Sequence, residues 1–364
     1  MATSVFSVYA SSDKSAPELN GLTGSLINVL DACLITGFGT RTSAGWSHPL
    51  PNEFGYACYQ PPSGSRMTLF VNDAGPTSSA TLNGTTREAL WVGYENLVSF
   101  TQSVGLSAAM NCGSGSGQFP TTVNLQNQTT NLATGIPSSG SFVVRKSATS
   151  SSLKRDWIMF ADAYTMYLFI SCGDSTTTRY IRYTFGDFFS LRGASDTYRC
   201  GLHARWAVNL ADVTGRYDWA DQICAPNTTV PNGFACPRNF GPGISFPVIL
   251  CQVGDAGKCN LTITITNTNG NQLTGTPMAG VIPTPNPVDN TLYMSPLWLA
   301  DSNSGTLRGR VRGCWQVCHA LNTFSDGQVI QGANELAGKT FQIVSPGNAS
   351  GFWAMEISPT VETN

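Results

Sequence analysis

Residues 24–39 read GSLINVLDACLITGFG and carry the clearest helical pattern of the chain. Ser25 stands where an N-cap residue is expected, and Gly37 stands where a left-handed residue would end the helix. A helix of about three turns is too short to be stable alone, so we expect its apolar side to dock on a larger body. The apolar residues at helical spacing are Leu26, Val29, Leu30, Cys33 and Leu34.

Most of the chain after this helix has the pattern of strands and turns. The most apolar region is 157–170, which we expect to form a hairpin that turns around Asp162. The sequence therefore predicts a mainly β protein of β-sandwich or barrel-like domains, with one short N-terminal helix. Apolar runs between turn signals predict strands at 54–60, 67–72, 89–95, 142–146, 156–161, 164–171, 180–184, 260–266, 306–311, 341–344 and 351–357.

The composition of the chain changes near residue 200, after which Pro, Asn and Cys become frequent. We therefore expect an N-terminal β domain over residues 1–200, with the short helix near 25–36. A C-terminal Pro/Asn/Cys-rich β domain is expected over residues 201–364. Between residues 103 and 140 apolar side chains are sparse, which predicts a long polar surface loop that contacts neighbouring subunits.

Charged residues make up only 12% of the 364 residues, against the roughly 25% usual for soluble domains. The formal net charge of −2 provides no electrostatic footprint for nucleic acid or for an anionic membrane. No apolar run reaches the ~20 residues that span a bilayer, and the first residues lack the pattern of a secretory signal. We therefore expect a chain made in a cytosol, without nucleic acid among its partners and without membrane insertion.

The chain has eleven cysteines, an odd number, so at least one is unpaired within the chain. A reducing cytosol favours buried free thiols, whereas an assembly released into an oxidising medium can hold disulfides. In that second case we expect Cys224 to pair with Cys236 and Cys251 with Cys259, because turn residues flank both pairs. The spacing alone leaves free thiols and disulfides open as alternatives.

Metal-ligating and catalytic motifs are scarce. Residues 314–319 read CWQVCH, but C-x3-C-H matches neither zinc-site nor haem-attachment spacing, so buried thiols are the favoured interpretation. A hydrolytic triad would have to use His48, His203 or His319, and the chain has no G-x-S-x-G elbow. We therefore expect no metal site and no cofactor.

Three acidic residues deserve comparison with the paired carboxylates of glycosidases: Asp162, Asp187 and Asp196. Each lies in a predicted turn region, where an Asp side chain usually accepts hydrogen bonds from nearby backbone N–H groups. Turn capping is therefore the favoured role, and we expect no enzymatic activity. Residues 308–312 read RGRVR, which places three arginines on one face of a strand and predicts an interface contact.

Trp206, Tyr217 and Trp219 lie in a polar context and could stack on sugar rings as a glycan-binding or partner-binding surface. Packing at a domain boundary is the competing interpretation, and it is favoured because aromatic side chains are usually buried.

Seven blocks follow one another along the chain: Gly24–Leu34, Gly37–Gly39, Ala44–Trp46, Leu69–Asp73, Gly93–Glu95, Phe185–Asp187 and Arg308–Arg310. In this order the blocks resemble a family of tailed-bacteriophage virion proteins. The first block is the most specific, and the later blocks are scattered over most of the chain. One departure is Arg312-Gly313, where the family pattern would have a Pro-Gly turn.

This resemblance implies a structural component of a virion, of the tail or baseplate, that acts through contacts with copies of itself and other virion proteins. A capsid decoration or head-attached protein is one alternative, and a receptor- or glycan-binding module of the particle is another. The expected location is the virion, assembled in the host cytoplasm. A polysaccharide-degrading enzyme is the third and least favoured class.

Overall fold

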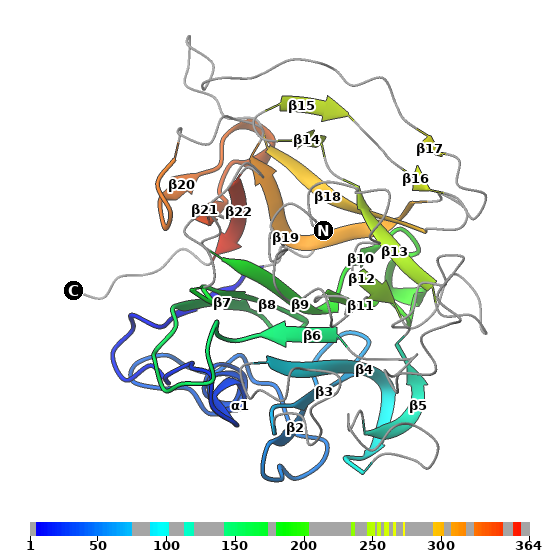
Figure 1. Cartoon of the computed structure of the whole chain (residues 1–364). Coiled ribbons are helices and arrows are strands. Elements are labelled where there is room, and N and C mark those ends of the chain that lie inside the picture. The colour runs from blue at the N-terminus through cyan, green and yellow to red at the C-terminus, as the bar shows by residue number, and fades with distance from the viewer. Residues whose placement is uncertain are drawn as a thin grey trace.

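The computed structural model shows a mainly β protein with antiparallel sheets and one short helix, as the sequence predicts (Figure 1). The arrangement is sandwich-like. The structure describes residues 5–74, 88–101, 113–119, 142–173, 180–203, 234–236, 246–251, 253–255, 258–261, 265–266, 272–273, 294–301, 307–317, 324–344 and 352–357.

Helix α1 spans Ser25–Asp31 and continues as a π-helical turn over Ala32–Thr36. All five residues of the predicted apolar stripe are fully buried. The expected caps are partly wrong. Gly24 occupies the N-cap position, and the Ser25 hydroxyl donates to the carbonyl of Asn20 instead. Gly37 has the expected positive φ of 78°, but its ψ of 170° is extended rather than left-handed helical.

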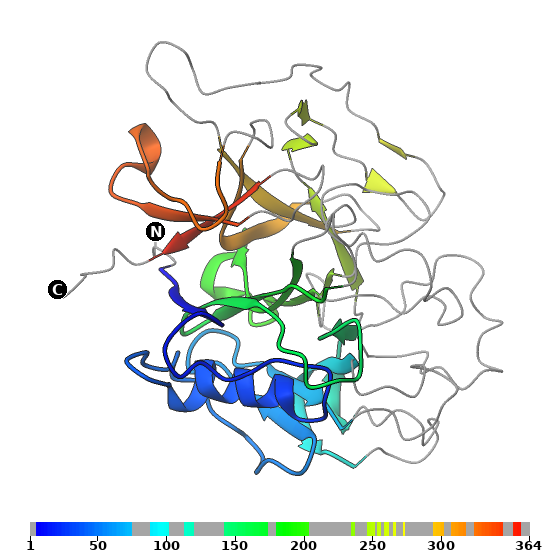
Figure 2. The same ribbon diagram turned by 60° about the vertical axis from the view of Figure 1, so that its left-hand side comes forward.

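A five-stranded antiparallel sheet covers α1 on the lower side of the molecule in Figure 1, and Figure 2 shows the helix lengthwise. The prediction of a long polar loop is wrong at Ser114–Gln118, which forms a strand of this sheet. The neighbouring strand provides hydrogen-bond partners for its backbone, so serine and glycine can form a strand there without apolar side chains. The strands are β2 Tyr56–Tyr59, β3 Thr68–Asn72, β4 Glu88–Ser99, β5 Ser114–Gln118 and β6 Phe142–Arg145.

The second large sheet has 13 strands. Its path runs β1-β7-β8-β9-β11-β12-β13-β18-β19-β22-β21-β20, and β10 pairs with β19. Strands from both sides of residue 200 share this sheet, while the expected division into two domains stays a prediction. The strands are β1 Ser7–Ala10, β7 Trp157–Ala161, β8 Thr165–Ile170, β9 Ile181–Asp187, β10 Phe189–Ser190, β11 Cys200–His203, β12 Phe234–Cys236, β13 Phe246–Cys251, β18 Met294–Asp301, β19 Leu307–Val317, β20 Val329–Gln331, β21 Thr340–Val344 and β22 Phe352–Ile357.

Strands β7 and β8 form the predicted central hairpin and are buried on both faces. Trp157 and Met159 face the core with α1 and the five-stranded sheet, whereas Ile158 and Phe160 face the core with β19 and β22. Figure 1 shows this hairpin as a middle layer, with the five-stranded sheet on one side and strands β19 and β22 on the other. Burial on both faces explains why 157–170 is a nearly continuous apolar run rather than an alternating one.

Strand β19 changes partners along its length. Arg310 pairs with Phe189 of β10, whereas Cys314 pairs with Met355 of β22. The pairing with β18 shifts in register between Pro296 and Trp298, and Gly313 lies opposite this shift with a φ of 54°. A positive φ suits glycine, so the Arg312-Gly313 departure from the virion-family pattern forms a bulge within a strand.

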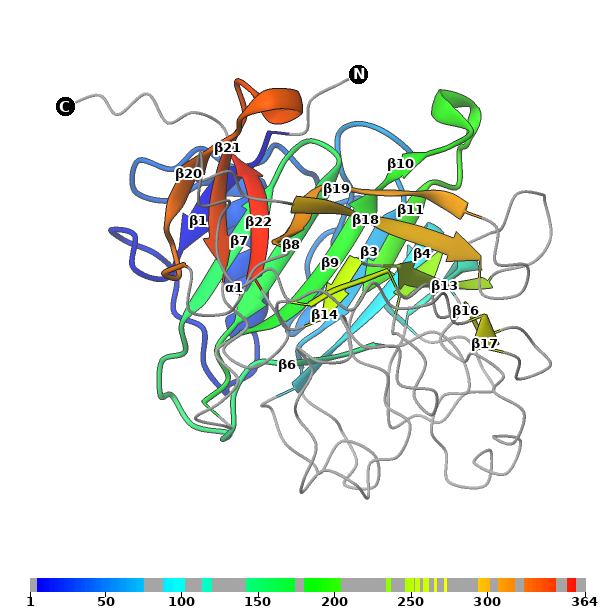
Figure 3. The same cartoon turned by 90° about the horizontal axis from the view of Figure 1, so that it is seen from above.

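Two small hairpins complete the described strands: β14 Val253–Asp255 with β15 Lys258–Leu261, and β16 Ile265–Thr266 with β17 Gln272–Leu273. The strand predicted at 260–266 is present at both ends, and residues 262–264 lie outside the described residues. The described ends of the chain meet where Phe6 forms a parallel bridge with Ile357. Figure 3 shows β1 and β7 beneath β21 and β22.

Candidate functional site

One polar network surrounds His48, next to the last residue of α1. The His48 Nδ1 atom lies 2.7 Å from the Cys58 carbonyl oxygen, and Nε2 lies 3.3 Å from Asp31 Oδ1. Tyr59 donates its hydroxyl hydrogen to the same Asp31 oxygen at 2.7 Å, and the Asn52 amide donates to Asp31 Oδ2 at 3.1 Å. The network joins α1 to β2 and to the loop before it.

This geometry favours a protonated imidazole. Nδ1 faces the Cys58 carbonyl, and Nε2 faces Asp31 and lies 3.4 Å from the Asn52 amide nitrogen. The hydrogen bond to Asp31 raises the pKa of His48 above its usual value. Protein groups occupy both ring nitrogens, so among the described residues the ring does not face a nucleophile as it would in a hydrolytic triad. The ring of His203 and the whole of His319 lie outside what the structure describes.

Asp162 caps the turn of the central hairpin, as predicted. Its Oδ1 atom accepts hydrogen bonds from the N–H groups of Tyr164 at 2.7 Å and Thr165 at 2.8 Å. Its Oδ2 atom lies 3.0 Å from a terminal nitrogen of Arg312, on the neighbouring layer. The Trp46 indole donates to the Asp162 carbonyl at 2.7 Å. One residue thus fixes the turn and joins it to β19 and to the loop before β2.

Asp187 ends β9 and is almost completely buried. Its carboxylate accepts hydrogen bonds from the Ser65 N–H at 2.9 Å, from the Ser65 hydroxyl, and from Arg199 Nε at 3.0 Å. The loop reaches it because Gly64 has no side chain: a Cβ atom there would lie 2.1 Å from Asp187 Oδ2. Burial raises the pKa of Asp187, while Ser65 and Arg199 oppose this shift.

Asp196 holds the segment that follows β10. It accepts hydrogen bonds from the Ser190 hydroxyl at 2.7 Å and from the Tyr198 N–H at 3.0 Å. It also lies 3.2 Å from a terminal nitrogen of Arg308, whose side chain is fully buried. Arg199 donates to the Asp196 carbonyl at 3.2 Å, which links this pair to Asp187.

The carboxylates of Asp162, Asp187 and Asp196 therefore hold segments of the fold together, and no two of them form a solvent-accessible pair like that of a glycosidase. Each of them is engaged by an arginine and by at least one backbone N–H group. A general acid that donates to a sugar oxygen must be reachable by substrate. At Asp187 the carboxylate is instead covered by protein donors, with 1% of the side chain exposed.

The arginine row of 308–312 contacts its own chain, so the predicted interface contact is wrong for its two buried members. Arg308 and Arg312 pair with Asp196 and Asp162, and each guanidinium also lies over an aromatic ring. Arg310 is half-buried over Phe189, at 5.2 Å from the ring centroid. The sequence showed three arginines on one strand face but not the carboxylates that the fold brings from 112 and 150 residues away.

Arg182 is buried between the same layers, and among the residues that the structure describes no carboxylate pairs with it. Its terminal nitrogen donates to Cys314 Sγ at 3.3 Å, and its guanidinium lies 4.2 Å from the centroid of the Trp353 ring. Its Nε atom is buried, and no described residue accepts a hydrogen bond from it. Burial raises the pKa of Cys314 to about 11, so the thiol is neutral and does not balance the arginine charge.

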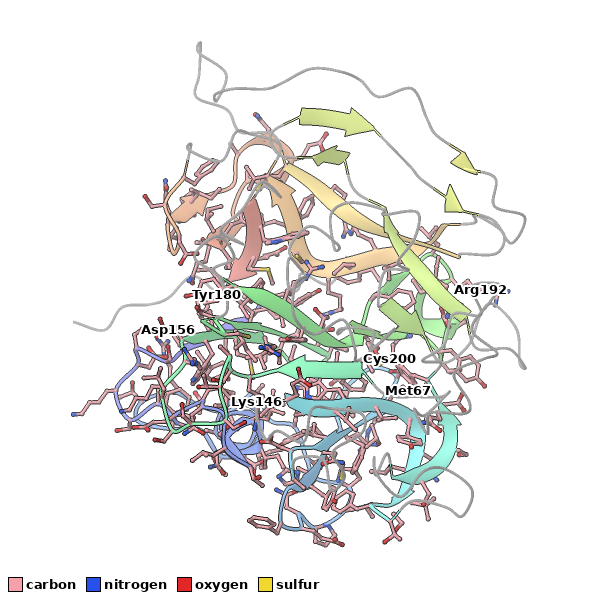
Figure 4. All side chains as sticks on the ribbon, viewed as in Figure 1. Met67, Lys146, Asp156, Tyr180, Arg192 and Cys200 are labelled. Atoms are coloured by element: carbon pink, nitrogen blue, oxygen red, sulfur yellow. The ribbon has the colours of Figure 1, made fainter. Side chains whose placement is uncertain are left out.

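A buried ion pair that sequence reasoning missed lies at the start of α1. Asp73 follows β3 and Lys146 follows β6, and neither side chain is exposed. Asp73 Oδ2 accepts hydrogen bonds from the N–H groups of Leu26 at 2.8 Å and Ile27 at 3.4 Å, so it caps the helix in place of Ser25. Lys146 Nζ contacts Asp73 Oδ1 and donates to the Leu22 carbonyl at 2.7 Å. In Figure 4 Lys146 lies where β6 ends, above α1.

Several predicted sites stay predictions. The aromatic residues Trp206, Tyr217 and Trp219, and Cys224, lie outside the described residues. Of the other predicted disulfide residues, the structure gives the backbone only: Cys236 lies on β12, Cys251 on β13 and Cys259 on β15.

Buried free thiols are present in the described part of the chain at Cys33, Cys58 and Cys314, and Cys172 and Cys200 are buried as well. Within the same residues no group of His, Cys, Asp and Glu has the arrangement of a metal site. None of the helices described is long and apolar enough to span a membrane. No protein-family model and no curated protein matches the chain.

Proposed function

We propose that this chain is a structural component of a bacteriophage virion, part of the tail or baseplate, that acts through contacts between subunits. The proposal begins from the blocks of sequence that resemble tailed-phage virion proteins. The first of these blocks, residues 24–34, contains α1 and the buried stripe that joins the helix to both large sheets. The resemblance therefore involves the residues that organise the core.

The observation that carries the proposal is the placement of charge. Only 12% of the residues are charged, and at least five arginine or lysine residues are used in ion pairs inside the fold. The described surface consequently depends on neutral polar side chains. Burying such a surface between subunits avoids much of the cost of desolvating charges, and the centres of protein interfaces are depleted in charged residues. This supports a role in permanent assembly.

Mass spectrometry of purified virions that encode this chain tests the proposal directly. We expect the chain in intact particles at a stoichiometry set by particle symmetry. Its absence from intact particles would refute the proposal. Immunogold labelling then separates the positions: label at the tail tip supports a tail or baseplate protein, and label over the head supports the capsid-decoration alternative.

A further inference from the structure

The pair of Asp73 and Lys146 has the groups that amide formation requires. An amine nitrogen contacts one carboxyl oxygen, and two backbone N–H groups donate to the other oxygen. Both side chains are excluded from solvent. These residues follow two different strands, β3 and β6, so the contact exists only in the folded chain.

We propose that Lys146 and Asp73 condense in the folded protein to an intramolecular isopeptide bond between Nζ and Cγ, with loss of one water molecule. The product is a neutral secondary amide that joins the ends of β3 and β6. This modification is a property of the fold and does not depend on the proposed virion role.

The reaction balances without any oxidant, metal or co-reactant. The ammonium group first transfers one proton to Asp73 Oδ1, which it contacts, to give a neutral amine and a carboxylic acid. The nitrogen lone pair then attacks Cγ and forms the C–N bond. Nitrogen passes a second proton to Oδ1, which already carries the first. The bond from Cγ to Oδ1 then breaks, Oδ1 leaves as water, and Oδ2 returns to a carbonyl. Nζ also donates to the Ser25 hydroxyl oxygen at 3.4 Å, a contact that helps to orient the nitrogen.

The start of α1 supplies the electrostatic support for this step. Attack on Cγ places negative charge on Asp73 Oδ2, the oxygen that accepts the N–H groups of Leu26 and Ile27. Backbone N–H groups that point at a developing oxyanion stabilise the tetrahedral intermediate. In the product, Oδ2 becomes an amide carbonyl that still accepts both hydrogen bonds. The helix therefore keeps its cap after the bond forms.

Burial favours the neutral reactants over the ion pair. It raises the pKa of Asp73 and lowers the pKa of Lys146, although the attraction between the two groups opposes both shifts. An amide also removes the cost of keeping two charges away from water. The ion pair of Lys154 and Glu18 provides the contrast: its side chains are 71% and 52% exposed, so water stabilises both charges and we expect no bond there.

The strand register brings the two residues together. Leu90 of β4 pairs with Asn72 on one side and with Val143 on the other, so β3 and β6 flank β4. Both strands run antiparallel to β4, so both end beside the first residues of β4. A bond between Asp73 and Lys146 would lock the two strands around the first residues of β4. It would also close a covalent loop in the unfolded chain, as a disulfide does.

The mass of the purified, denatured wild-type protein tests the proposal. We expect a mass lower than the sequence mass by that of one water, after reduction of all cysteines. Trypsin cannot cleave after an acylated lysine, so a digest should contain a branched peptide of residues 67–87 joined to residues 146–154. A protein of full sequence mass, or a branch at any other residue, would overturn the proposal.

Two variants complete the experiment. Lys146→Met removes the amine and should restore the full sequence mass together with the two linear peptides. Lys154→Arg, at the exposed pair, should keep the mass deficit and the branch at Lys146. A deficit that persists in Lys146→Met would contradict the assignment. The wild-type measurement decides the question even if Lys146→Met folds poorly, because mass is read on denatured protein.

Discussion

At the scale of single residues, His48 makes part of the stability dependent on pH. The pKa of His48 is raised in the folded chain, so its protonated form stabilises the fold. This contribution is complete below the unfolded pKa of about 6.5 and is lost as the pH rises through the higher folded value. We expect His48→Gln to lower the melting temperature at about pH 5.5–6, where the wild-type imidazole is protonated. The difference in melting temperature between variant and wild type should become smaller toward about pH 8.5.

Melting curves of the variant and the wild type over this pH range provide the measurement. Subtracting one melting temperature from the other removes the contribution of groups that titrate equally in both proteins. Asp31, Tyr59, Asn52 and Cys58 surround the ring, and only Asp31 among them carries a charge near neutral pH. A difference that grows with rising pH would show that the neutral ring is the stabilising form.

Arg182 has a buried charge that no carboxylate balances among the described residues. It is 4% exposed, and its guanidinium contacts a neutral thiol and the Trp353 ring. Replacing buried charge by an apolar side chain of similar size is often neutral or stabilising by about 1–4 kcal/mol. We therefore expect Arg182→Met to unfold at an equal or higher urea concentration. A large loss of stability would show that the cation–π contact with Trp353 outweighs the desolvation cost.

At the scale of elements, the docking of α1 depends on its apolar stripe. Leu30 is fully buried in a cluster that contains residues of α1 and of both large sheets. Leu30→Ala should cost on the order of 2–5 kcal/mol and lower the melting temperature of the isolated chain. The matched control is Leu153→Ala, because Leu153 is 60% exposed. An unchanged melting temperature in Leu30→Ala would instead indicate that the stripe contributes to an assembly contact.

Elements with a periodic apolar pattern could be predicted from the sequence, and elements held by distant partners could not. The strands around the central hairpin were predicted closely, since burial on both faces requires apolar residues there. Strand β5 reads SGSGQ and has no periodic apolar pattern. It forms because β4 provides the hydrogen-bond partners of its backbone. The predicted strand at 54–60 begins too early, because Phe54 and Gly55 form a turn and β2 begins at Tyr56. The cap of α1 comes from Asp73, which lies 47 residues beyond the Leu26 N–H that it accepts.

The same distinction applies to the candidate sites. Turn capping by Asp162 is a local interaction and was predicted correctly. The ion pairs of Arg308 and Arg312 depend on layers that pack together, and no spacing in the sequence records such packing. The pair of Asp73 and Lys146 depends on two strands meeting on either side of β4.

At the scale of the whole molecule, the layers should differ in local stability. Strands β7 and β8 are covered on both faces, whereas Val329 and Gln331 of β20 are exposed at the last position of the large sheet. We expect the amides of β8 to exchange with solvent only through global unfolding, and those of β20 through local opening. Hydrogen exchange followed by mass spectrometry measures both. Faster exchange in β8 than in β20 would contradict the layered core.

The bridge between Phe6 and Ile357 has a mechanical consequence. Because the two segments are parallel, a force that pulls the chain ends apart acts along both of them in opposite directions. Such a force shears the contacts of β1 and β22 together, including the pairing of β1 with β7 and of β22 with β19. Contacts sheared together share the load, whereas a hairpin opened from its end loses them one after another. The chain should therefore bear tension between its ends better than tension that peels β20 from β21.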